Sequence, residues 1–333
     1  MICLAKIVEV IYLFNILVSI AKIIIGFIML IKGADFFVDG AAAVAKKLGV
    51  PELVIGLTIV AMGTSAPEAA VSLSAAVAGN NGISIGNVIG SNIMNVLVIL
   101  GITSIITTLK VKPATVKVDI PFVIISTIVM VAWGMTFGKL TRLTGIIFLL
   151  ALFSYMGYLI WYSKHTDSED EGENVKDIKL WLIPIFILGG LFVIVLGSKI
   201  AVAGAADIAR FFGVSDRVIG LTIVALGTSL PELMTSVTAA RKGSADIAIG
   251  NIVGSNLFNI LFILGLTTLI IPLPYVSEGA NFIIDGFVAL GAVLLLFILV
   301  VKNKRLGRTG GIIMLLGYAA YFVYLLLSGS NPV

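Results

Sequence analysis

The chain has a single cysteine, Cys3, and a single histidine, His165, among its 333 residues. One cysteine excludes an internal disulfide framework and a thiolate metal cluster, and one histidine excludes a multi-histidine metal site. Charged residues are also scarce, at 12% of the chain, whereas hydrophobic residues make up 59%. The mean hydropathy of +1.15 does not fit a soluble domain, in which about a quarter of the residues are charged. The composition is typical of an integral membrane protein.

The apolar residues form ten runs, each long enough to cross a hydrocarbon core of about 30 Å. Because lipid leaves no backbone polar group unpaired, runs of this length are helices. We therefore expect an all-α membrane protein with spans near 16–43, 50–79, 83–108, 117–136, 142–162, 180–209, 215–240, 246–270, 279–301 and 309–327. Residues 1–15 lack the cleavage pattern of a signal peptide, so we expect a retained N-terminal lead-in.

The two halves of the chain repeat each other. Residues 55–101 align without a gap on residues 219–265, with 28 identities in 47 positions. Many identities are polar, and both copies read GTS.PE followed by IGN..GSN, which indicates a duplication. Five spans per half is an odd number, so the second half enters the membrane from the opposite side. We expect two five-helix inverted repeats, 16–162 and 180–333, joined by an acidic linker at 163–179.

The lysines and arginines are distributed unequally between the loops on the two sides of the membrane. Fourteen lie on the side of the 163–179 linker and five on the other. Since basic loops remain in the cytoplasm, we expect a multi-pass protein of the cell membrane with both termini outside and the linker cytoplasmic. These residues lie in short loops between apolar runs, so they are topology signals and do not predict a nucleic-acid surface.

Each repeat carries a proline followed by a glutamate inside an apolar run, at Pro67–Glu68 and Pro231–Glu232. Proline has no amide hydrogen and clashes with the carbonyl four residues earlier, so the helix is interrupted and the carbonyls of residues 61–64 are freed. Irregular backbone and a carboxylate at membrane depth are tolerated where they line a cavity or bind an ion. Glu68 and Glu232 are therefore predicted to bind a transported ion.

Further polar residues lie at helical spacing around the glutamates. Thr64, Glu68 and Ser72 fall at i, i+4 and i+8 and share one helix face, and positions 87, 91 and 95 do the same on the next helix. Glu68 and Asn95 each lie roughly 18–21 Å from the turn that joins their helices, at 1.5 Å per residue, so they reach similar depth. The second repeat has the same pattern. Close approach of these helices is predicted at four glycines, Gly86, Gly90, Gly250 and Gly254.

The predicted ligands are all oxygens, from carboxylates, amides, hydroxyls and freed carbonyls. Hard cations choose such sites, and Ca²⁺ takes about 6–8 oxygens in flexible geometry, whereas Mg²⁺ demands a rigid octahedron. Sodium has nearly the ionic radius of calcium and fits the same oxygens in turn. One calcium ion neutralises the charge of two glutamates.

Simpler interpretations apply to several polar residues. Lys32 and Lys199 are possible salt-bridge partners of the glutamates. Interhelical hydrogen bonding is the expected role of Ser72, Asn87 and Asn92. We expect the aspartates of the first and sixth spans to be solvated and outside the site: Asp35, Asp39 and Asp207. The acidic residues of 163–179 lack the ligand spacing of a calcium loop.

The paired GTS.PE and IGN..GSN motifs resemble the two alpha-repeats of the calcium/cation antiporter superfamily, and prokaryotic sodium/calcium exchangers most of all. This resemblance covers essentially the whole chain and implies exchange of sodium for calcium by alternating access, usually with calcium extrusion. It implies that spans 1 and 6 slide past the other helices. It also implies a ligand set of carboxylates from Glu68 and Glu232, hydroxyls from Ser65, Ser229, Ser91 and Ser255, carbonyls of Ala61, Thr64, Ala225 and Thr228, and amides of Asn95 and Asn259.

Family members that also carry potassium have an acid at one of the last two positions, so asparagine at both argues against potassium co-transport. A proton/calcium antiporter on the same fold is the alternative function. A membrane hydrolase is disfavoured, because neither glutamate has a His or Cys partner or an HExxH motif, and a channel is disfavoured by the inverted repeats.

We expect no enzymatic activity and no cofactor, only Ca²⁺ and Na⁺ as substrates, and a monomer in the lipid bilayer with no protein partner implied.

Overall fold

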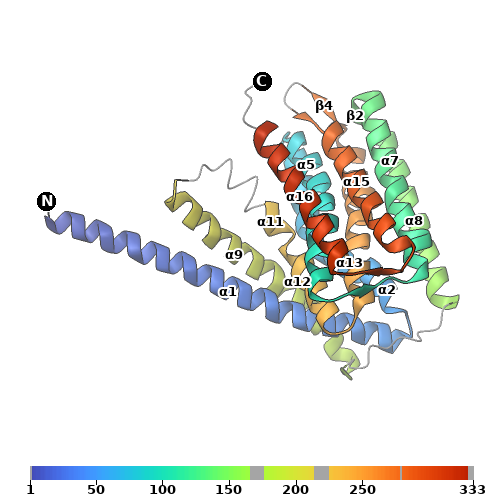
Figure 1. Cartoon of the computed structure of the whole chain (residues 1–333), viewed down its shortest axis with the longest axis horizontal. Helices are drawn as coiled ribbons and strands as arrows, with labels where there is room; N and C mark the ends of the chain where they lie inside the picture. Colours follow the sequence, from blue (N-terminus) through green and yellow to red (C-terminus); the bar gives the residue numbers. More distant parts are fainter. Residues whose placement is uncertain (1, 166–175, 214–224, 278–279, 329–333) are drawn as a thin grey trace.

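The computed structural model describes residues 2–165, 176–213, 225–277 and 280–328, and they are almost entirely helical (Figure 1). In this part of the chain, eight helices are long and apolar enough to cross a membrane, or nine if a bent helix pair is one span. The molecule is an all-α membrane protein. The first part of the expected span 215–240 lies outside the described residues, as does most of the acidic linker.

The helices of the first half follow the predicted spans closely. Residues 2–15, expected as a lead-in, form the first turns of one long helix, α1, that continues through the first span. The remaining helices and their bounds are α2 (Glu52–Ile55), η1 (Gly56–Val60), α3 (Ala61–Thr64), α4 (Ala66–Val77), α5 (Asn81–Met94), η2 (Asn95–Leu100), α6 (Gly101–Ile106), η3 (Thr115–Asp119), α7 (Ile120–Phe137) and α8 (Arg142–His165), with α1 covering Ile2–Leu48.

The second half repeats this order. Its helices are η4 (Leu180–Leu182), η5 (Ile185–Gly189), α9 (Gly190–Phe211), α11 (Ala225–Thr228), α12 (Leu230–Arg241), α13 (Ala245–Leu257), η7 (Phe258–Leu264), α14 (Gly265–Ile270), α15 (Ile283–Val301) and α16 (Arg308–Ser328). The π-helical segments η2 and η7 both begin beside a predicted site asparagine, at Asn95 and just before Asn259. Wide turns of this kind occur frequently at functional sites.

Short antiparallel strand pairs join loops of the two halves at both ends of the bundle. At one end, β1 (Leu109–Lys110) pairs with β6 (Arg305–Leu306), and at the other, β2 (Lys139–Leu140) pairs with β3 (Leu273–Pro274). A third pair, β4 (Val276–Ser277) with β5 (Ala280–Asn281), lies within the loop before α15. The end that carries β1 and β6 also carries the end of α8 and the start of η4, and we call it the linker face.

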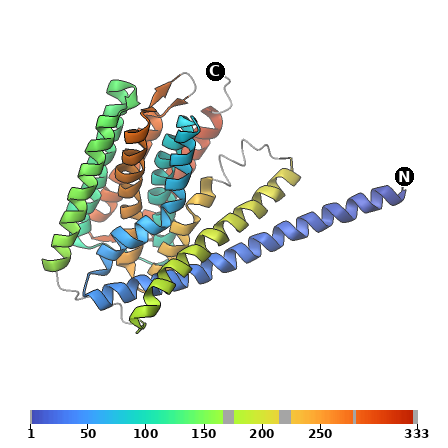
Figure 2. The same ribbon diagram turned by 180° about the vertical axis from the view of Figure 1, so that it is seen from behind.

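Helices α1 and α9 lie side by side and extend from the bundle as a pair, as both views show (Figure 2). Glycines let the two backbones touch. A Cβ built on Gly197 would lie 2.8 Å from the carbonyl oxygen of Gly26, and one on Gly190 would lie 2.7 Å from the amide nitrogen of Phe37. Lys22 of α1 also pairs with Asp207 of α9 at 2.8 Å. The two helices are thereby tied to each other along their length.

Replacing Gly197 by alanine should destabilise the protein, because the added methyl group meets backbone that cannot move aside. We expect a loss of about 1–3 kcal/mol, the usual range for an overpacked contact. Thermal unfolding in detergent measures the effect. The matched control is Gly157→Ala in α8, where a Cβ meets nothing within 4 Å. Equal melting temperatures for the two variants would contradict the close packing of α1 on α9.

Candidate functional site

The proline-glutamate segments break their helices in the same way in both halves. Ser65 has φ −83° and ψ 4°, and Ser229 has φ −91° and ψ 1°, so neither residue continues the preceding helix. In the first half the helix axis bends by 46° at this point. Pro67 and Pro231 then stand in the first turn of α4 and α12, where proline is tolerated. The predicted interruption of the helix is confirmed.

Both glutamates are buried next to one another. Their exposed fractions are each 1%, and the two carboxyl groups are close enough to interact electrostatically. The Ser65 hydroxyl donates a hydrogen bond of 3.2 Å to Oε1 of Glu232, and the Thr228 hydroxyl lies beside Glu68. Among the described residues, the other three carboxylate oxygens accept no well-formed hydrogen bond. A buried carboxylate without donors has a large desolvation cost unless a cation approaches it.

Each glutamate is held by an asparagine from the following helix. Asn87 donates from its amide nitrogen to the Glu68 carbonyl at 3.2 Å and to the Ser72 hydroxyl at 2.9 Å. In the second half, Asn251 makes the same two bonds, to the Glu232 carbonyl at 3.4 Å and to the Ser236 hydroxyl at 2.9 Å. Asn251 also accepts the Thr64 hydroxyl at 3.0 Å, which connects the two halves. The hydrogen-bonding role predicted for Asn87 and Ser72 is confirmed.

Four asparagines form a reciprocal network where α5 crosses α13, and we call it the asparagine ring. The amide nitrogens of Asn92 and Asn256 each donate to the other's backbone carbonyl at 3.3 Å. Asn95 donates to Oδ1 of Asn256 at 3.0 Å, and Asn259 donates to Oδ1 of Asn92 at 3.0 Å. All four are at most 5% exposed. The amide nitrogens of Asn95 and Asn259 are therefore occupied, and their buried Oδ1 atoms lack a partner among the described residues.

The remaining predicted ligands lie in the same helix segments. Ser91 and Ser255 are buried, one turn before the π-helical segments, and the Ser229 hydroxyl is buried with no partner among the described residues. The Ala61 carbonyl accepts the Ser65 amide at 3.0 Å and lies 3.5 Å from the Ser255 hydroxyl. Ala225 begins α11. The carbonyl of Ala61 is thus less free than the sequence predicts, because Ser65 still completes the last helical turn before the break.

The site as built offers carboxylate, amide and hydroxyl oxygens from both halves of the chain. No group of three or more His, Cys, Asp or Glu side chains that could hold a metal occurs among the described residues. Two carboxylates surrounded by neutral oxygens suit a hard cation that must also be released. A tighter cage with more acids would favour a permanently bound ion.

Helices α1 and α9 pass directly over both breaks. A Cβ on Gly63 would lie 3.2 Å from the ring of Phe37 in α1 and 3.3 Å from a methyl group of Leu191 in α9. Gly227 lies against Val202 of α9, and its carbonyl accepts a hydrogen bond of 2.5 Å from Ser198 of the same helix. The pair therefore covers the polar site on the side away from the bundle.

The structure disfavours the salt-bridge alternative for the glutamates, because Lys32 and Lys199 are exposed and, in the part of the chain that the structure describes, neither pairs with Glu68 or Glu232. One sequence expectation is wrong. Asp39 is not solvated, since its side chain is 10% exposed and ion-paired.

The predicted glycine contacts are confirmed in the second half only, where Gly250 and Gly254 pack on η1 backbone. Gly86 makes ordinary contact with Phe282, and Gly90 has no described atom within 4 Å of a built Cβ.

The sequence reasoning missed two further intramembrane carboxylates. Asp119 accepts a hydrogen bond of 2.8 Å from Tyr155, and Asp285 accepts one of 2.7 Å from Tyr321. Both pairs are separated by 36 residues. The first links η3, which leads into α7, to α8, and the second links α15 to α16 in an equivalent place. The signal was present as an aspartate at the start of an apolar run in each half. These pairs lie on the outer helices and contribute nothing to the asparagine ring.

Comparison with protein families gives a consistent match over both halves. A family model described as "Sodium/calcium exchanger protein" matches residues 18–161 and 182–327. CaxA of Alkalimonas amylolytica, named as an antiporter, is 38% identical over 324 residues, which cover 94% of this chain and 99% of CaxA. Sodium/calcium exchanger MaX1 of Methanosarcina acetivorans is 34% identical and is covered to 98%, with 92% of this chain aligned.

Comparison with solved structures gives the same result for the fold. The sodium-calcium exchanger NCX_Mj, from crystals soaked with Na⁺ and Ca²⁺, superposes with a TM-score of 0.79 at 32% sequence identity. The superposition covers 92% of this chain and 98% of NCX_Mj.

Proposed function

Because the chain belongs to the sodium/calcium exchanger family, we propose that it exchanges Na⁺ for Ca²⁺ by alternating access at the site around Glu68 and Glu232. Members of this family are transporters and not enzymes, and cation/calcium antiport is the activity at the level of the family. Sodium as the counter-ion, extrusion of calcium and the individual ligands are the further content of the proposal.

The observation that carries the proposal is a set of buried side-chain oxygens that have no hydrogen-bond partner among the described residues. Three carboxylate oxygens of the two glutamates and the Oδ1 atoms of Asn95 and Asn259 are buried without a partner among the described residues. The residues beside them are hydroxyls and backbone carbonyls. We assign Glu68 and Glu232 as carboxylate ligands, with Ser65, Ser229, Ser91, Ser255, Asn95, Asn259 and the carbonyls of Ala61, Thr64, Ala225 and Thr228 as neutral ones.

Shared carboxylates explain why such a site exchanges ions and does not leak them. Calcium and sodium compete for the same two glutamates, so the empty site is left with two uncompensated charges inside the membrane. A charged group at membrane depth is costly, and crossing is therefore easier when the site is loaded. If three sodium ions move for each calcium ion, one net charge crosses per cycle, worth about 2.3 kcal/mol per 100 mV.

Alternating access is assigned to α1 and α9, which cover both breaks and are tied to each other more closely than to the bundle. The ten-helix, two-repeat plan is part of the proposal and is supported by the reciprocal contacts between equivalent residues of the two halves. We place both termini outside and the linker face in the cytoplasm, from the distribution of basic residues. In such an exchanger a sodium gradient directed inward drives calcium out.

Uptake of calcium-45 into proteoliposomes tests the choice of counter-ion. Vesicles loaded with sodium should take up calcium, whereas choline-loaded vesicles at the same pH should not, because sodium must leave the site before calcium enters. Uptake indifferent to sodium but driven by an imposed pH gradient would instead identify a proton/calcium antiporter on this fold. Adding potassium to the sodium-loaded vesicles should have no effect, since both central positions are asparagine.

A further inference from the structure

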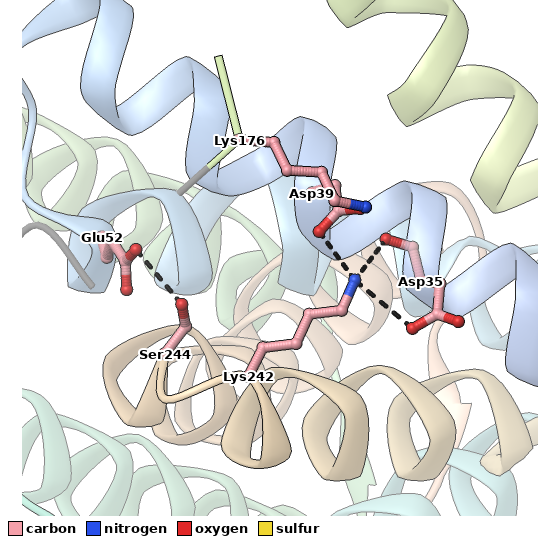
Figure 3. A network of polar contacts seen from close by, with 6 residues as sticks. All are labelled: Asp35, Asp39, Glu52, Lys176, Lys242 and Ser244. Atoms are coloured by element: carbon pink, nitrogen blue, oxygen red, sulfur yellow. Dashed lines mark hydrogen bonds and ion pairs between the residues drawn. The ribbon is translucent and has the colours of Figure 1, made fainter. Parts of the chain in front are cut away.

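A lysine from the bundle reaches across to α1 at the linker face (Figure 3). Lys242 follows α12 in the turn before α13, and its ammonium group lies 2.7 Å from Oδ1 of Asp39 and 3.3 Å from Oδ1 of Asp35. The same ammonium group donates to the backbone carbonyl of Asp35 at 2.9 Å. One bundle side chain therefore contacts three oxygens of α1.

The Lys242–Asp39 pair at the centre of the network is only partly open to water. The side chain of Asp39 is 10% exposed and that of Lys242 is 29% exposed. The other carboxylate oxygen of Asp39 pairs with Lys176 at 2.8 Å, at the end of the segment that joins the two halves. Asp39 is thus held between two cations, and the hydrogen bond to Asp39 together with its charge raises the pKa of Lys176 above the usual value. Ion pairs shielded from solvent are screened less by salt.

The position of the network places it on the moving boundary of the proposed transport cycle. Asp35 and Asp39 belong to α1, which is fastened to α9 by glycine packing and by the Lys22–Asp207 pair. Lys242 belongs to the bundle. Displacement of α1 and α9 along the bundle must separate Lys242 from its three oxygens, whereas the bonds between α1 and α9 stay intact.

The other half of the repeat lacks the residues for an equivalent network. A shift of 164 positions, which superposes the glycines of α1 on those of α9, places Ala78 at the position of Lys242 and Ala203 at that of Asp39. Lys199 stands at the position of Asp35. In a transporter built from inverted repeats, the two halves have different conformations in each state. When one face closes and the other opens, the halves exchange these conformations. A network whose residues have no counterpart in the other half therefore breaks the equivalence of the two states.

We propose that Lys242, Asp35 and Asp39 form an ionic latch that closes the linker face and biases the resting transporter toward the opposite opening. Lys176 adds a second cation to Asp39 and couples the latch to the segment between the halves. The latch rests on the proposed alternating access, and it sets the population of the two states without touching the transported ions. Its function is to determine the side from which an unloaded transporter first accepts a cation.

Distances between spin labels on the full chain test the latch. In a Cys3→Ser background, one label pair at Leu188 and Lys302 spans the linker face, and a second pair at Phe212 and Phe137 spans the opposite face. Leu188 in η5 and Phe212 lie at the two ends of α9, whereas Lys302 and Phe137 lie at the ends of bundle helices, and all four side chains are exposed. Lys242→Met should raise the population with an open linker face about two- to five-fold, the range expected for a partly exposed ion pair.

The matched control is Lys110→Met, which removes an exposed lysine from the same face outside the network. Indistinguishable distance distributions for Lys242→Met and Lys110→Met would overturn the proposal. A second variant leaves the latch intact and builds its counterpart at the other face, through Ala78→Lys with Ala203→Asp. This variant should also raise the population with an open linker face, and an unchanged population would contradict the latch even if Lys242→Met failed to fold.

The measurement separates the latch from the proposed function, because it records conformation and not transport. If the distance distributions respond as expected but calcium uptake does not depend on sodium, the latch is supported and the assignment of sodium as counter-ion is wrong. If calcium uptake depends on sodium but the distance distributions do not change, the sodium assignment is supported and the latch is wrong.

Discussion

Glutamine in place of Glu68 or Glu232 should reduce sodium-dependent calcium uptake by about two orders of magnitude. Removing one member of a buried charge pair costs about 2–5 kcal/mol, and every 1.4 kcal/mol is a factor of ten in affinity. The substitution keeps the size of the side chain and removes one of the two charges that neutralise calcium. Initial rates of calcium-45 uptake into sodium-loaded proteoliposomes, taken over a range of calcium concentrations, measure the loss.

Glu52→Gln is the matched control for this experiment. Glu52 is also buried, but it lies at the linker face, where its carboxylate accepts a hydrogen bond of 3.2 Å from Ser244. Glutamine keeps an acceptor oxygen there, so uptake should remain near the wild-type rate. Wild-type uptake by both Glu68→Gln and Glu232→Gln would show that the ions cross elsewhere in the molecule.

Leucine in place of Asn256 should weaken calcium binding by about tenfold, within the range of about 1–3 kcal/mol for leaving a buried polar group unpaired. The asparagine ring fixes the amide of Asn95 by accepting from its nitrogen. Without Asn256 this amide is free to turn, and its NH₂ group can then face the cation in place of Oδ1. The predicted change is therefore a higher KM for calcium, with a smaller change in the maximal rate.

A double-mutant cycle with Asn92→Leu identifies the source of this effect. Asn92 and Asn256 bond to each other directly, so their effects on KM should be strongly non-additive. Additive effects would mean that each asparagine acts only through local packing. Thr103→Val serves as the control for stability, because Thr103 is buried in α6 and its hydroxyl bonds locally, to the carbonyl of Ile99 one turn earlier in η2.

The sequence predicts the centre of the site because that centre is built from residues with few other uses in a membrane helix. A proline followed by a glutamate in an apolar run predicts a broken helix with a functional carboxylate. The recurrence of this pair after 164 positions predicts the same local structure in both halves. Helical spacing then orders the neighbouring polar residues. Apart from the recurrence itself, these signals act between residues a few positions apart on one helix, where spacing determines which side chains share a face.

Contacts between distant segments could not be predicted in the same way. Lys242 and Asp39 are 203 residues apart, and nothing in their own neighbourhoods indicates which cation meets which carboxylate. The network around Asn92 has the same difficulty, because an interhelical hydrogen bond was expected without knowledge of its partner. The unequal glycine contacts of α5 and α13 are a further case, since nearly identical motifs predict identical packing and the two halves differ in what they pack against.

The asparagine ring has one more consequence, which concerns how such a molecule is assembled. Asn92 bonds to Asn256 as Asn256 bonds to Asn92, and this self-complementary pairing is the isologous contact of a twofold homodimer. Neither half of the chain contains a complete ring, and each half contributes one of the two glutamates. If the halves are inverted repeats, as proposed, two separate copies of one half inserted in opposite directions would possess every element at the centre of the site. The covalent connection between the halves therefore sets their ratio and orientation, and the centre of the site is specified by their interface.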